Sequence, residues 1–188
     1  MRRSEDTSAG YLEMLRTAGR LKSVPRKGWV KKLGIEQPES VADHSYRTAL
    51  MAMLYSDLRG LDTARVLRMA LLHDLPEAVV GDTIPGERTR REKLRLESAA
   101  MKRILAALPR EQRERYYGIW REFNRGATRE AMLVREVDKL EMAVQAREYG
   151  RTLHGTGTQE FIQSARESIA DPDLLALLRR VLGKDVPG

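Results

Sequence analysis

The sequence contains no cysteine among its 188 residues. Disulfides, thiolate metal sites and cysteine nucleophiles are therefore excluded. The sequence also lacks a run of about 18 apolar residues, so we expect no membrane span. The first residues lack the apolar segment of a signal peptide. Together these absences lead us to expect a protein of the reducing cytoplasm.

Aromatic residues are also scarce, at 5% of the chain, whereas the hydrophobic share is 41% and the charged share is 32%. The last two shares fit a folded protein rather than a disordered one. Leu, Met, Ala and Val must fill the core, and alternating strand patterns are missing, so helices are favoured. Because the length is typical of one domain, we predict an all-α fold with a single domain over residues 1–188 and its core roughly at residues 8–182.

Lys and Arg outnumber Asp and Glu by 34 to 27, which gives a net charge of +7. Such an excess is compatible with nucleic acid, with an anionic small substrate, or with an Arg-rich, salt-bridged surface. The basic residues are spread along the chain among acidic ones, and no aromatic–basic RNA motif is present. We therefore favour the surface interpretation for most of them and expect no specific nucleic-acid partner.

Apolar residues recur at helical spacing through most of the chain. Pro and Gly interrupt this pattern at residues 23–38 and 150–157, where we predict loops, and Pro76 is expected to restart a short helical turn. Asp62 or Thr63 suits the N-terminal cap of one helix. The predicted helices cover residues 9–22, 39–58, 62–73, 87–108, 110–124, 128–149, 159–169 and 173–182.

A histidine followed by an aspartate, His73-Asp74, stands at the end of an apolar helical run. Burying such groups costs free energy unless something pairs with them, and a metal ion would do so. His44 and Asp138 lie on the apolar sides of two other predicted helices, so one ion can bind all four residues. Two imidazoles and two carboxylates suit Mn, Fe, Co, Ni or Zn better than Ca or Mg.

Each of these residues also has a plain structural interpretation. His44 alone is more typical of a satisfied core histidine, a His-Asp pair occurs by chance in many proteins, and Asp138 can pair with Lys139 or Arg135. Their combination on apolar helix faces favours the metal site over these alternatives. Glu77 follows the pair by three residues, so a helical turn would bring it to the site, but it could also be a surface residue of a first helical turn.

Four motifs carry a family resemblance: Pro25-Arg26-x-Gly28-Trp29, Pro38-Glu39-Ser40-Val41-Ala42-Asp43-His44-Ser45, His73-Asp74-x-x-Glu77-x-x-x-Gly81-Asp82 and Asp138-Lys139-Leu140-Glu141. As a set they resemble the HD superfamily of metal-dependent phosphohydrolases. The resemblance is closest to the HD-domain 5′-deoxynucleotidases, which remove phosphate from deoxyribonucleoside monophosphates. It covers roughly residues 8–180.

The resemblance implies a helical HD-domain bundle and a role for each motif residue. The implied metal ligands are His44, His73, Asp74 and Asp138. Glu77 stands at the position of the family's catalytic carboxylate, where it can take a proton from water or donate one to the leaving oxygen. Arg26 stands where the family binds the phosphate, and Asp82 stands where it binds the sugar hydroxyl.

One departure from the family concerns Trp29. In a bacterial branch of the family the phosphate-binding Arg and the sugar-side Trp are adjacent, whereas Lys27 and Gly28 separate Arg26 from Trp29 here. We therefore expect Trp29 to be a pocket or hinge residue rather than the residue that senses the missing 2′-hydroxyl. A packing role is the alternative.

The number of histidines limits the metal content. Two-metal members of the superfamily need additional histidine ligands, and only His154 remains here, so we expect one divalent transition metal: Co, Mn, Ni, Fe or Zn. The expected activity is hydrolysis of deoxyribonucleoside 5′-monophosphates by a homodimer, as the resemblance implies. The alternatives are an HD phosphohydrolase acting on another nucleotide or sugar phosphate, and a nucleotide-binding protein on an HD scaffold.

Overall fold

Helices account for almost all regular structure in the computed structural model, which describes residues 2–153 and 157–183. Within these residues the only β pairing is an isolated bridge between Pro25 and Ser40. The all-α prediction is therefore confirmed. The helices are α1 (Arg2–Gly19), the 3₁₀ helix η1 (Arg20–Ser23), α2 (Lys27–Leu33), α3 (Val41–Leu58), α4 (Thr63–Leu72), α5 (Glu77–Val80), α6 (Arg90–Leu105), α7 (Arg110–Arg125), α8 (Arg129–Leu153), α9 (Gln159–Ser168) and α10 (Pro172–Val181).

Capping side chains set the starts of two central helices. Asp62 accepts a hydrogen bond from the Arg65 backbone N–H and caps α4, as predicted. α3 starts slightly later than predicted, because Ser40 caps it in a capping box with Asp43 and leaves Pro38 outside the helix.

The prediction of a loop over residues 23–38 was wrong in its middle, where α2 forms. Both prolines lie outside this helix, and Gly34, with a φ of 66°, ends it in the left-handed conformation that glycine favours. Trp29 is buried in a cluster with Ala146, Phe161 and Ile162. Leu33, one turn further along α2, packs against this cluster. Tertiary burial therefore stabilises a short helix that local propensity alone disfavours.

Two other helices are longer than predicted. α1 begins at Arg2 rather than at residue 9. α8 continues through Gly150 to Leu153, so the loop predicted from residue 150 starts later; one glycine inside a long helix costs only about 1 kcal/mol. Residues 154–156 of that predicted loop, which include His154, lie outside the described residues.

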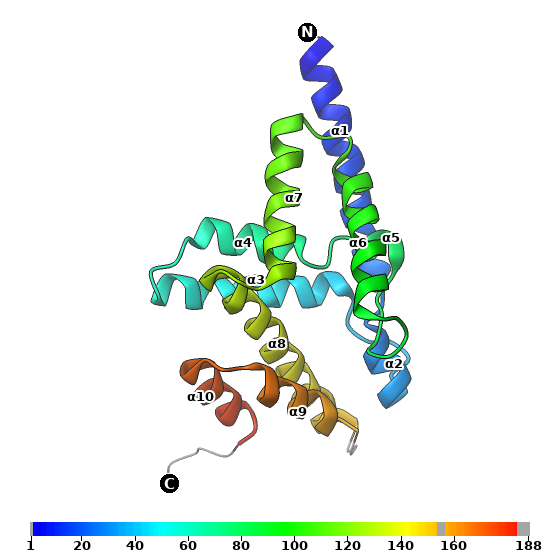
Figure 1. The fold of residues 1–188 in the computed structure, drawn as a ribbon. Helices are drawn as coiled ribbons and strands as arrows, with labels where there is room; N and C mark the ends of the chain where they lie inside the picture. Colours follow the sequence, from blue (N-terminus) through cyan, green and yellow to red (C-terminus); the bar gives the residue numbers. More distant parts are fainter. Residues whose placement is uncertain (1, 154–156, 184–188) are drawn as a thin grey trace.

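The helices converge on one central region (Figure 1). α3 and α4 pack against each other across the middle of the molecule, and α8 packs on both as it runs downward in this view. α7 packs against α4 and α8. On the upper side, α6 packs against α7, and α1 packs against α6. α9 and α10 pack against α8 in the lower part. The start of α3, the end of α4 and the middle of α8 thereby meet, and these segments carry the predicted metal ligands.

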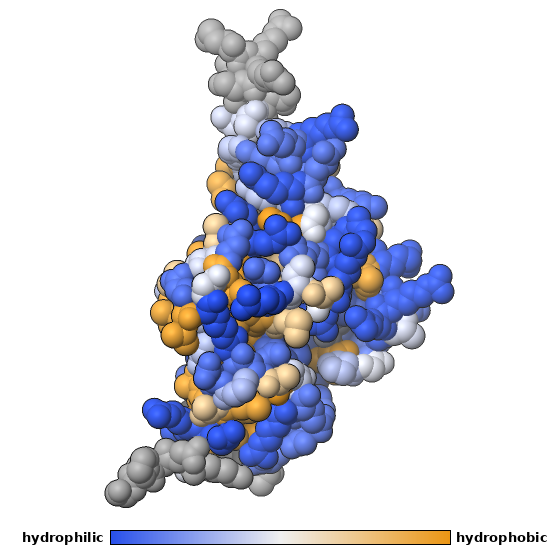
Figure 2. All heavy atoms as spheres, turned by 60° about the vertical axis from the view of Figure 1, so that its left-hand side comes forward, coloured by the Kyte–Doolittle hydropathy of each residue, from blue (hydrophilic) through white to orange (hydrophobic). Residues whose placement is uncertain are grey.

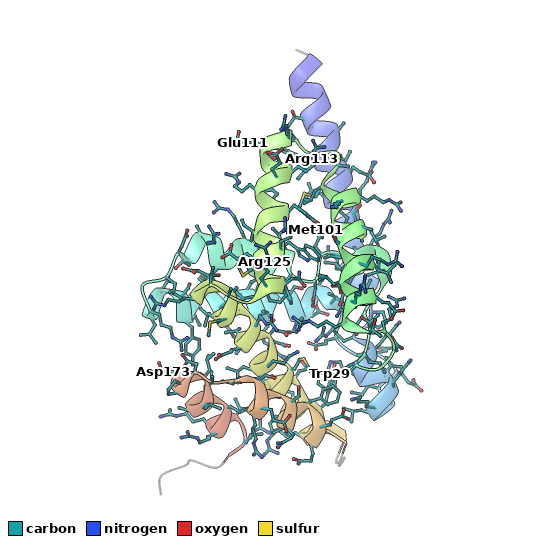
Figure 3. All side chains as sticks on the ribbon, viewed as in Figure 1. Trp29, Met101, Glu111, Arg113, Arg125 and Asp173 are labelled. Carbon is teal, nitrogen blue, oxygen red and sulfur yellow. The ribbon has the colours of Figure 1, made fainter. Side chains whose placement is uncertain are left out.

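Two groups of buried side chains hold this arrangement together. The larger group spans most of the helices and includes Met69, Met101, Leu105, Trp120, Leu140, Leu174 and Leu178. The smaller group joins α2, α8 and α9 through Trp29, Ala146, Phe161 and Ile162. Figure 3 shows Trp29 at this junction, near the lower end of the molecule. Burial of each large apolar side chain contributes about 1.5–3 kcal/mol.

The surface is mostly polar on the face drawn in Figure 2, where hydrophobic residues form small separate groups. The salt-bridged surface expected from the sequence is present in pairs such as Arg65 with Glu122 and Arg110 with Glu114. No helix among the described residues is long and apolar enough to cross a membrane. The cytoplasmic location and the lack of a specific nucleic-acid partner stay predictions.

Candidate active site

The structure brings the four predicted metal ligands together from three helices. His44 lies on α3 and Asp138 on α8. His73 is the C-cap of α4, and Asp74 follows it directly. One ligand atom each of His44, His73 and Asp74 lies within 4.8 Å of the others. His44 Nε2 lies 3.1 Å from Asp138 Oδ1, so the fourth residue joins the same cluster.

Both imidazoles are fixed through their Nδ1 atoms. His44 Nδ1 contacts a carboxylate oxygen of Glu141, and His73 Nδ1 lies 2.6 Å from the carbonyl oxygen of Ala70. A backbone carbonyl can only accept a hydrogen bond, so this contact assigns the His73 proton to Nδ1. The Glu141 carboxylate favours the same tautomer of His44. Each ring therefore turns its Nε2, the nitrogen that remains available to a metal ion, toward the cluster.

The cluster fits a divalent metal ion. His44 Nε2 and His73 Nε2 are both buried and have no hydrogen-bond partner. His73 Nε2 lies 3.1 Å from Asp74 Oδ2, but this contact lacks hydrogen-bond geometry. Two buried imidazole lone pairs beside carboxylate oxygens are satisfied together by a cation. Mn, Fe, Co, Ni and Zn all accept such a set of nitrogen and oxygen ligands.

The carboxylates also give the cluster a negative potential. In the metal-free protein, burial and Arg26 oppose a proton on His44, but Asp138 and Glu141 outweigh them and raise the pKa of its imidazole to about 9, so a metal ion would displace this proton when it binds Nε2. Burial disfavours charge on Asp138 as well, yet Lys139 and His44 hold the pKa of its carboxyl well below the usual value. Asp138 is therefore a carboxylate at neutral pH.

Glu77 lies beside this cluster at the start of α5. Its backbone N–H donates to the carbonyl oxygen of Asp74 over 2.9 Å, so the predicted helical turn joins the two residues. Glu77 is buried, and its Oε2 has no hydrogen-bond partner. Burial, together with Asp74 and Asp82, raises the pKa of the Glu77 carboxyl well above its usual value. This carboxyl can therefore hold a proton beside Asp74, whose own carboxyl has a lowered pKa.

A cleft with two lobes opens over the cluster. Both lobes are lined by Asp74, Arg90, Lys93, Asp138 and Lys139. The α2 lobe has a volume of about 380 Å³ and is further lined by Arg26, Trp29, Glu77, Asp82, Arg88 and Phe161. The α7 lobe has a volume of about 450 Å³ and is further lined by Leu94, Glu97, Phe123, Asn124, Arg135 and Ser168. Either lobe has the size of a small-molecule site.

Arg26 and Trp29 line the same lobe although two residues separate them. Arg26 is the N-cap of α2, and the Trp29 backbone N–H donates to its carbonyl oxygen over 3.2 Å, so one helical turn spans the separation. Arg26 Nη1 lies 3.5 Å from Asp74 Oδ2. Burial opposes the charge of Arg26, but Asp74 and Asp82 outweigh burial and raise its pKa further. Arg26 is thus a half-buried cation at the edge of the ligand cluster.

Trp29 is both a pocket wall and a packed core residue. Its Nε1 donates to Glu39 Oε1 over 2.9 Å, and its ring centroid lies 4.1 Å from that of Phe161 and 5.3 Å from that of Tyr149. A Cβ on Gly28 would lie 3.2 Å from the Phe161 ring, so the glycine before Trp29 permits this close approach. The inserted glycine therefore belongs to the packing of α2 against α9.

Asp82 connects two of the motif segments. Its Oδ2 accepts a hydrogen bond from the Lys27 backbone N–H over 2.6 Å, at the start of α2. The preceding Gly81 has a φ of 74°, a conformation that glycine adopts at little cost. Asp82 is buried and lines the α2 lobe. It therefore fixes α2, with Arg26 and Trp29, relative to α5 and Glu77.

Comparison with known proteins identifies the family. The family model described as an HD domain matches residues 18–174. The chain belongs to the HD-domain family. This HD domain is 41% identical over 177 residues to the 5′-deoxynucleotidase HDDC2 of Mus musculus, with 93% of this chain and 88% of that protein covered. It is 39% identical over 153 residues to the 5′-deoxynucleotidase hdd1 of Schizosaccharomyces pombe, with 79% and 76% covered.

Solved structures agree with this assignment. The PH0347 protein of Pyrococcus horikoshii OT3 matches this HD domain with a TM-score of 0.76 and 30% identity, over 93% of this chain and 99% of that one. A conserved hypothetical protein of Pyrococcus furiosus matches with a TM-score of 0.75 and 32% identity, over 90% and 99%. The family resemblance predicted from the motifs is therefore confirmed.

Arg47 supports a predicted ligand of this HD domain, although it was not predicted to belong to the site. Arg47 Nε donates to Glu141 Oε1 over 2.8 Å, and the other oxygen of Glu141 contacts His44. Arg47 also binds Gln145 and, over 2.9 Å, Glu148. Arg47 follows His44 by three residues, so helical spacing could have indicated that both face α8.

Two further side chains contribute to the site in roles that were not predicted from the sequence. Glu39 accepts the Trp29 hydrogen bond, and burial together with Glu141 raises its pKa to about 7. Phe123 contacts the His73 ring edge-on at a centroid distance of 5.3 Å and lines the α7 lobe. Neither role has a local sequence signal, because each depends on how distant helices pack.

Proposed function

We propose that this HD domain is a metal-dependent 5′-deoxynucleotidase, which hydrolyses deoxyribonucleoside 5′-monophosphates to deoxyribonucleoside and phosphate. One observation carries the chemistry: two buried imidazole nitrogens without partners lie beside two carboxylates under a cleft lined by basic side chains. The substrate class is supported by relatives named 5′-deoxynucleotidase, among them HDDC2 of Homo sapiens at 41% identity over 169 residues.

The metal would be bound by His44, His73, Asp74 and Asp138. We propose a single divalent transition metal from the set Co, Mn, Ni, Fe and Zn, because this donor set of two nitrogens and two oxygens suits those ions. When bound, such an ion acts as a Lewis acid toward phosphoryl oxygens and lowers the pKa of bound water.

Phosphate binding and proton transfer fall to the residues around the cluster. Arg26 borders the ligands and can donate two parallel N–H groups to the phosphate. The water oxygen forms a bond to phosphorus while the bond from phosphorus to the 5′ oxygen breaks, and one water proton ends on the leaving 5′ oxygen. Glu77 is placed to carry a proton in this exchange. Trp29 and Asp82 form the wall where the sugar would lie.

A panel of phosphomonoesters tests the proposed substrate. With a divalent metal present, phosphate release from a deoxyribonucleoside monophosphate should exceed release from the ribonucleotide with the same base. Equal rates would contradict the deoxyribose preference. Release only from another nucleotide or a sugar phosphate would favour a different HD phosphohydrolase, and binding without release would favour a nucleotide-binding protein.

Arg47→Ala is expected to weaken metal affinity by about tenfold, the low end of the range for loss of a residue that hydrogen-bonds a metal ligand, because Arg47 acts on His44 through Glu141. The variant leaves the Glu141 carboxylate without the guanidinium that fixes it against His44. Metal content after competition with a chelator measures the change. Arg65→Ala removes a similar Arg–Glu contact on α4, away from the cluster, and should leave affinity unchanged. Unchanged affinity in Arg47→Ala would contradict the proposed support.

We also propose that the whole chain forms one HD domain, as predicted for residues 1–188 with a core at 8–182. A Cβ on Gly10 of α1 would lie 2.0 Å from the carbonyl oxygen of Ala107, so α1 is in direct contact with the turn that follows α6. Leu178 of α10 is buried in the larger core group. Both contacts support one domain that extends beyond the matched residues 18–174.

The homodimer implied by the family resemblance has a candidate surface on α3. Large apolar side chains recur there every fourth residue and are 71%, 42%, 58% and 71% exposed at Tyr46, Leu50, Leu54 and Leu58. A stripe of this kind can pair with its own copy across a two-fold axis. We propose that a second copy of this chain covers it.

Leu54→Glu is therefore expected to convert a dimer into a monomer, because it places a charge within an apolar contact. Light scattering coupled to size-exclusion chromatography measures the mass. Leu15→Glu is the matched control, since Leu15 is 68% exposed on α1. A monomeric parent protein, or dissociation by the control alone, would contradict the α3 interface.

A further inference from the structure

Lys93 lies beside Glu77, at the point where the two lobes of the cleft meet. It belongs to the start of α6 and lines both lobes. Its Nζ lies 3.9 Å from Glu77 Oε1 and 3.4 Å from Glu97 Oε1. The mechanism described above gives Lys93 no task, although a cation at this point faces the place where a phosphate would be bound.

Glu97 keeps the Lys93 ammonium group in this position. The two residues are four apart on α6, so their side chains lie on the same face. The Glu97 side chain is only 12% exposed, whereas that of Lys93 is 41% exposed and remains open to the cleft. Burial lowers the pKa of Lys93, but Glu97, Glu77 and Asp74 outweigh it and raise the pKa above the usual value. Lys93 therefore stays charged at neutral pH.

Other basic residues around the cluster are placed differently. Lys139 Nζ pairs with Asp138 Oδ2 over 3.1 Å, so its charge is directed at a proposed metal ligand. Within the described part of the chain, no ion pair or hydrogen bond fixes the Arg90 guanidinium. Arg26 approaches the cluster from the start of α2. Lys93 is thus both fixed in place and accessible from the cleft on the α6 side.

We propose that Lys93 binds a phosphoryl oxygen of the monophosphate from α6, while Arg26 binds it from α2, and that Lys93 thereby aligns the phosphate with Glu77. This inference rests on the proposed function. An ammonium group suits the task because it is a compact point charge with three donors that can turn toward an oxygen. Glu97 is then a positioning residue for the ammonium group.

Lys93→Met tests the proposal, because methionine keeps most of the apolar stem and removes the charge. In the metal-loaded enzyme we expect kcat/KM for a deoxyribonucleoside monophosphate to fall at least tenfold. The inhibition constant of inorganic phosphate should rise by a similar factor. Inhibition by the uncharged deoxyribonucleoside product and the metal content should not change. Lys93→Arg should recover part of the loss, since it restores the positive charge.

Arg91→Met is the matched control, because Arg91 is an exposed basic residue of the same helix that lines neither lobe. It should resemble the parent protein in every constant. Lys93→Met with parent-like kinetics would overturn the inference, and so would a fall in kcat/KM without weaker phosphate inhibition. Calorimetric titration of inorganic phosphate into the parent and Lys93→Met tests phosphate binding even if neither protein hydrolyses a monophosphate, so this inference and the proposed function can fail separately.

Discussion

Glu77→Gln is expected to keep its metal and to lose phosphate release by about 10²–10⁴-fold, the usual contribution of general acid–base catalysis. The amide matches the carboxyl in size, so the buried site should keep its shape, but it cannot exchange a proton with water or with the leaving oxygen. Initial rates with a deoxyribonucleoside monophosphate, together with metal content, measure both parts of this expectation.

Glu111→Gln provides the control for this variant. Glu111 lies at the upper end of α7, far from Trp29 in Figure 3, and it lines neither lobe of the cleft. It should leave both the rate and the metal content unchanged. Loss of metal in Glu77→Gln would instead make Glu77 a metal ligand, and an unchanged rate would remove it from the mechanism.

Asp138→Asn is expected to abolish metal-dependent activity. It should also weaken metal affinity by more than the roughly 10–100-fold loss that is typical when a residue that only hydrogen-bonds to a metal ligand is removed. The substitution removes a negative charge 3.1 Å from His44 Nε2 with almost no change in shape. Metal content after dialysis against a chelator, and phosphate release with added metal, measure the effect.

The matched substitution is Asp173→Asn, at a 68% exposed side chain on α10. It should retain metal and activity. Circular dichroism of both variants should show the parent's helix content, so that a loss of metal is not a loss of fold. Retention of full metal affinity in Asp138→Asn would contradict the proposed ligand set.

The candidate metal ligands could be predicted because helical periodicity is a local property of the sequence. His44 recurs with Val41 and Thr48 on one face, and all three are buried in the structure. Pro76 and Gly81 mark the short α5, which brings Glu77 next to Asp74. The sequence therefore contained enough information to choose the helices and the polar residues that meet at their ends.

The surroundings of that cluster could not be predicted in the same way. α2 is a seven-residue helix between prolines, and it forms because Trp29 packs against Phe161 from a distant helix. Lys93 is one of many charged residues on α6, and only the packing of α6 near α5 distinguishes it from Arg91. Both depend on tertiary contacts that have no repeating pattern in the sequence.

The most direct test of the account is to titrate metal into protein that has been stripped with a chelator while phosphate release from a deoxyribonucleoside monophosphate is followed. A single metal site predicts no phosphate release from the stripped protein. The rate of release should rise on addition of Co²⁺ or Mn²⁺ and reach its maximum at one bound ion per chain. Release that needs no metal, or that saturates only at two ions per chain, would contradict a single metal held by His44, His73, Asp74 and Asp138.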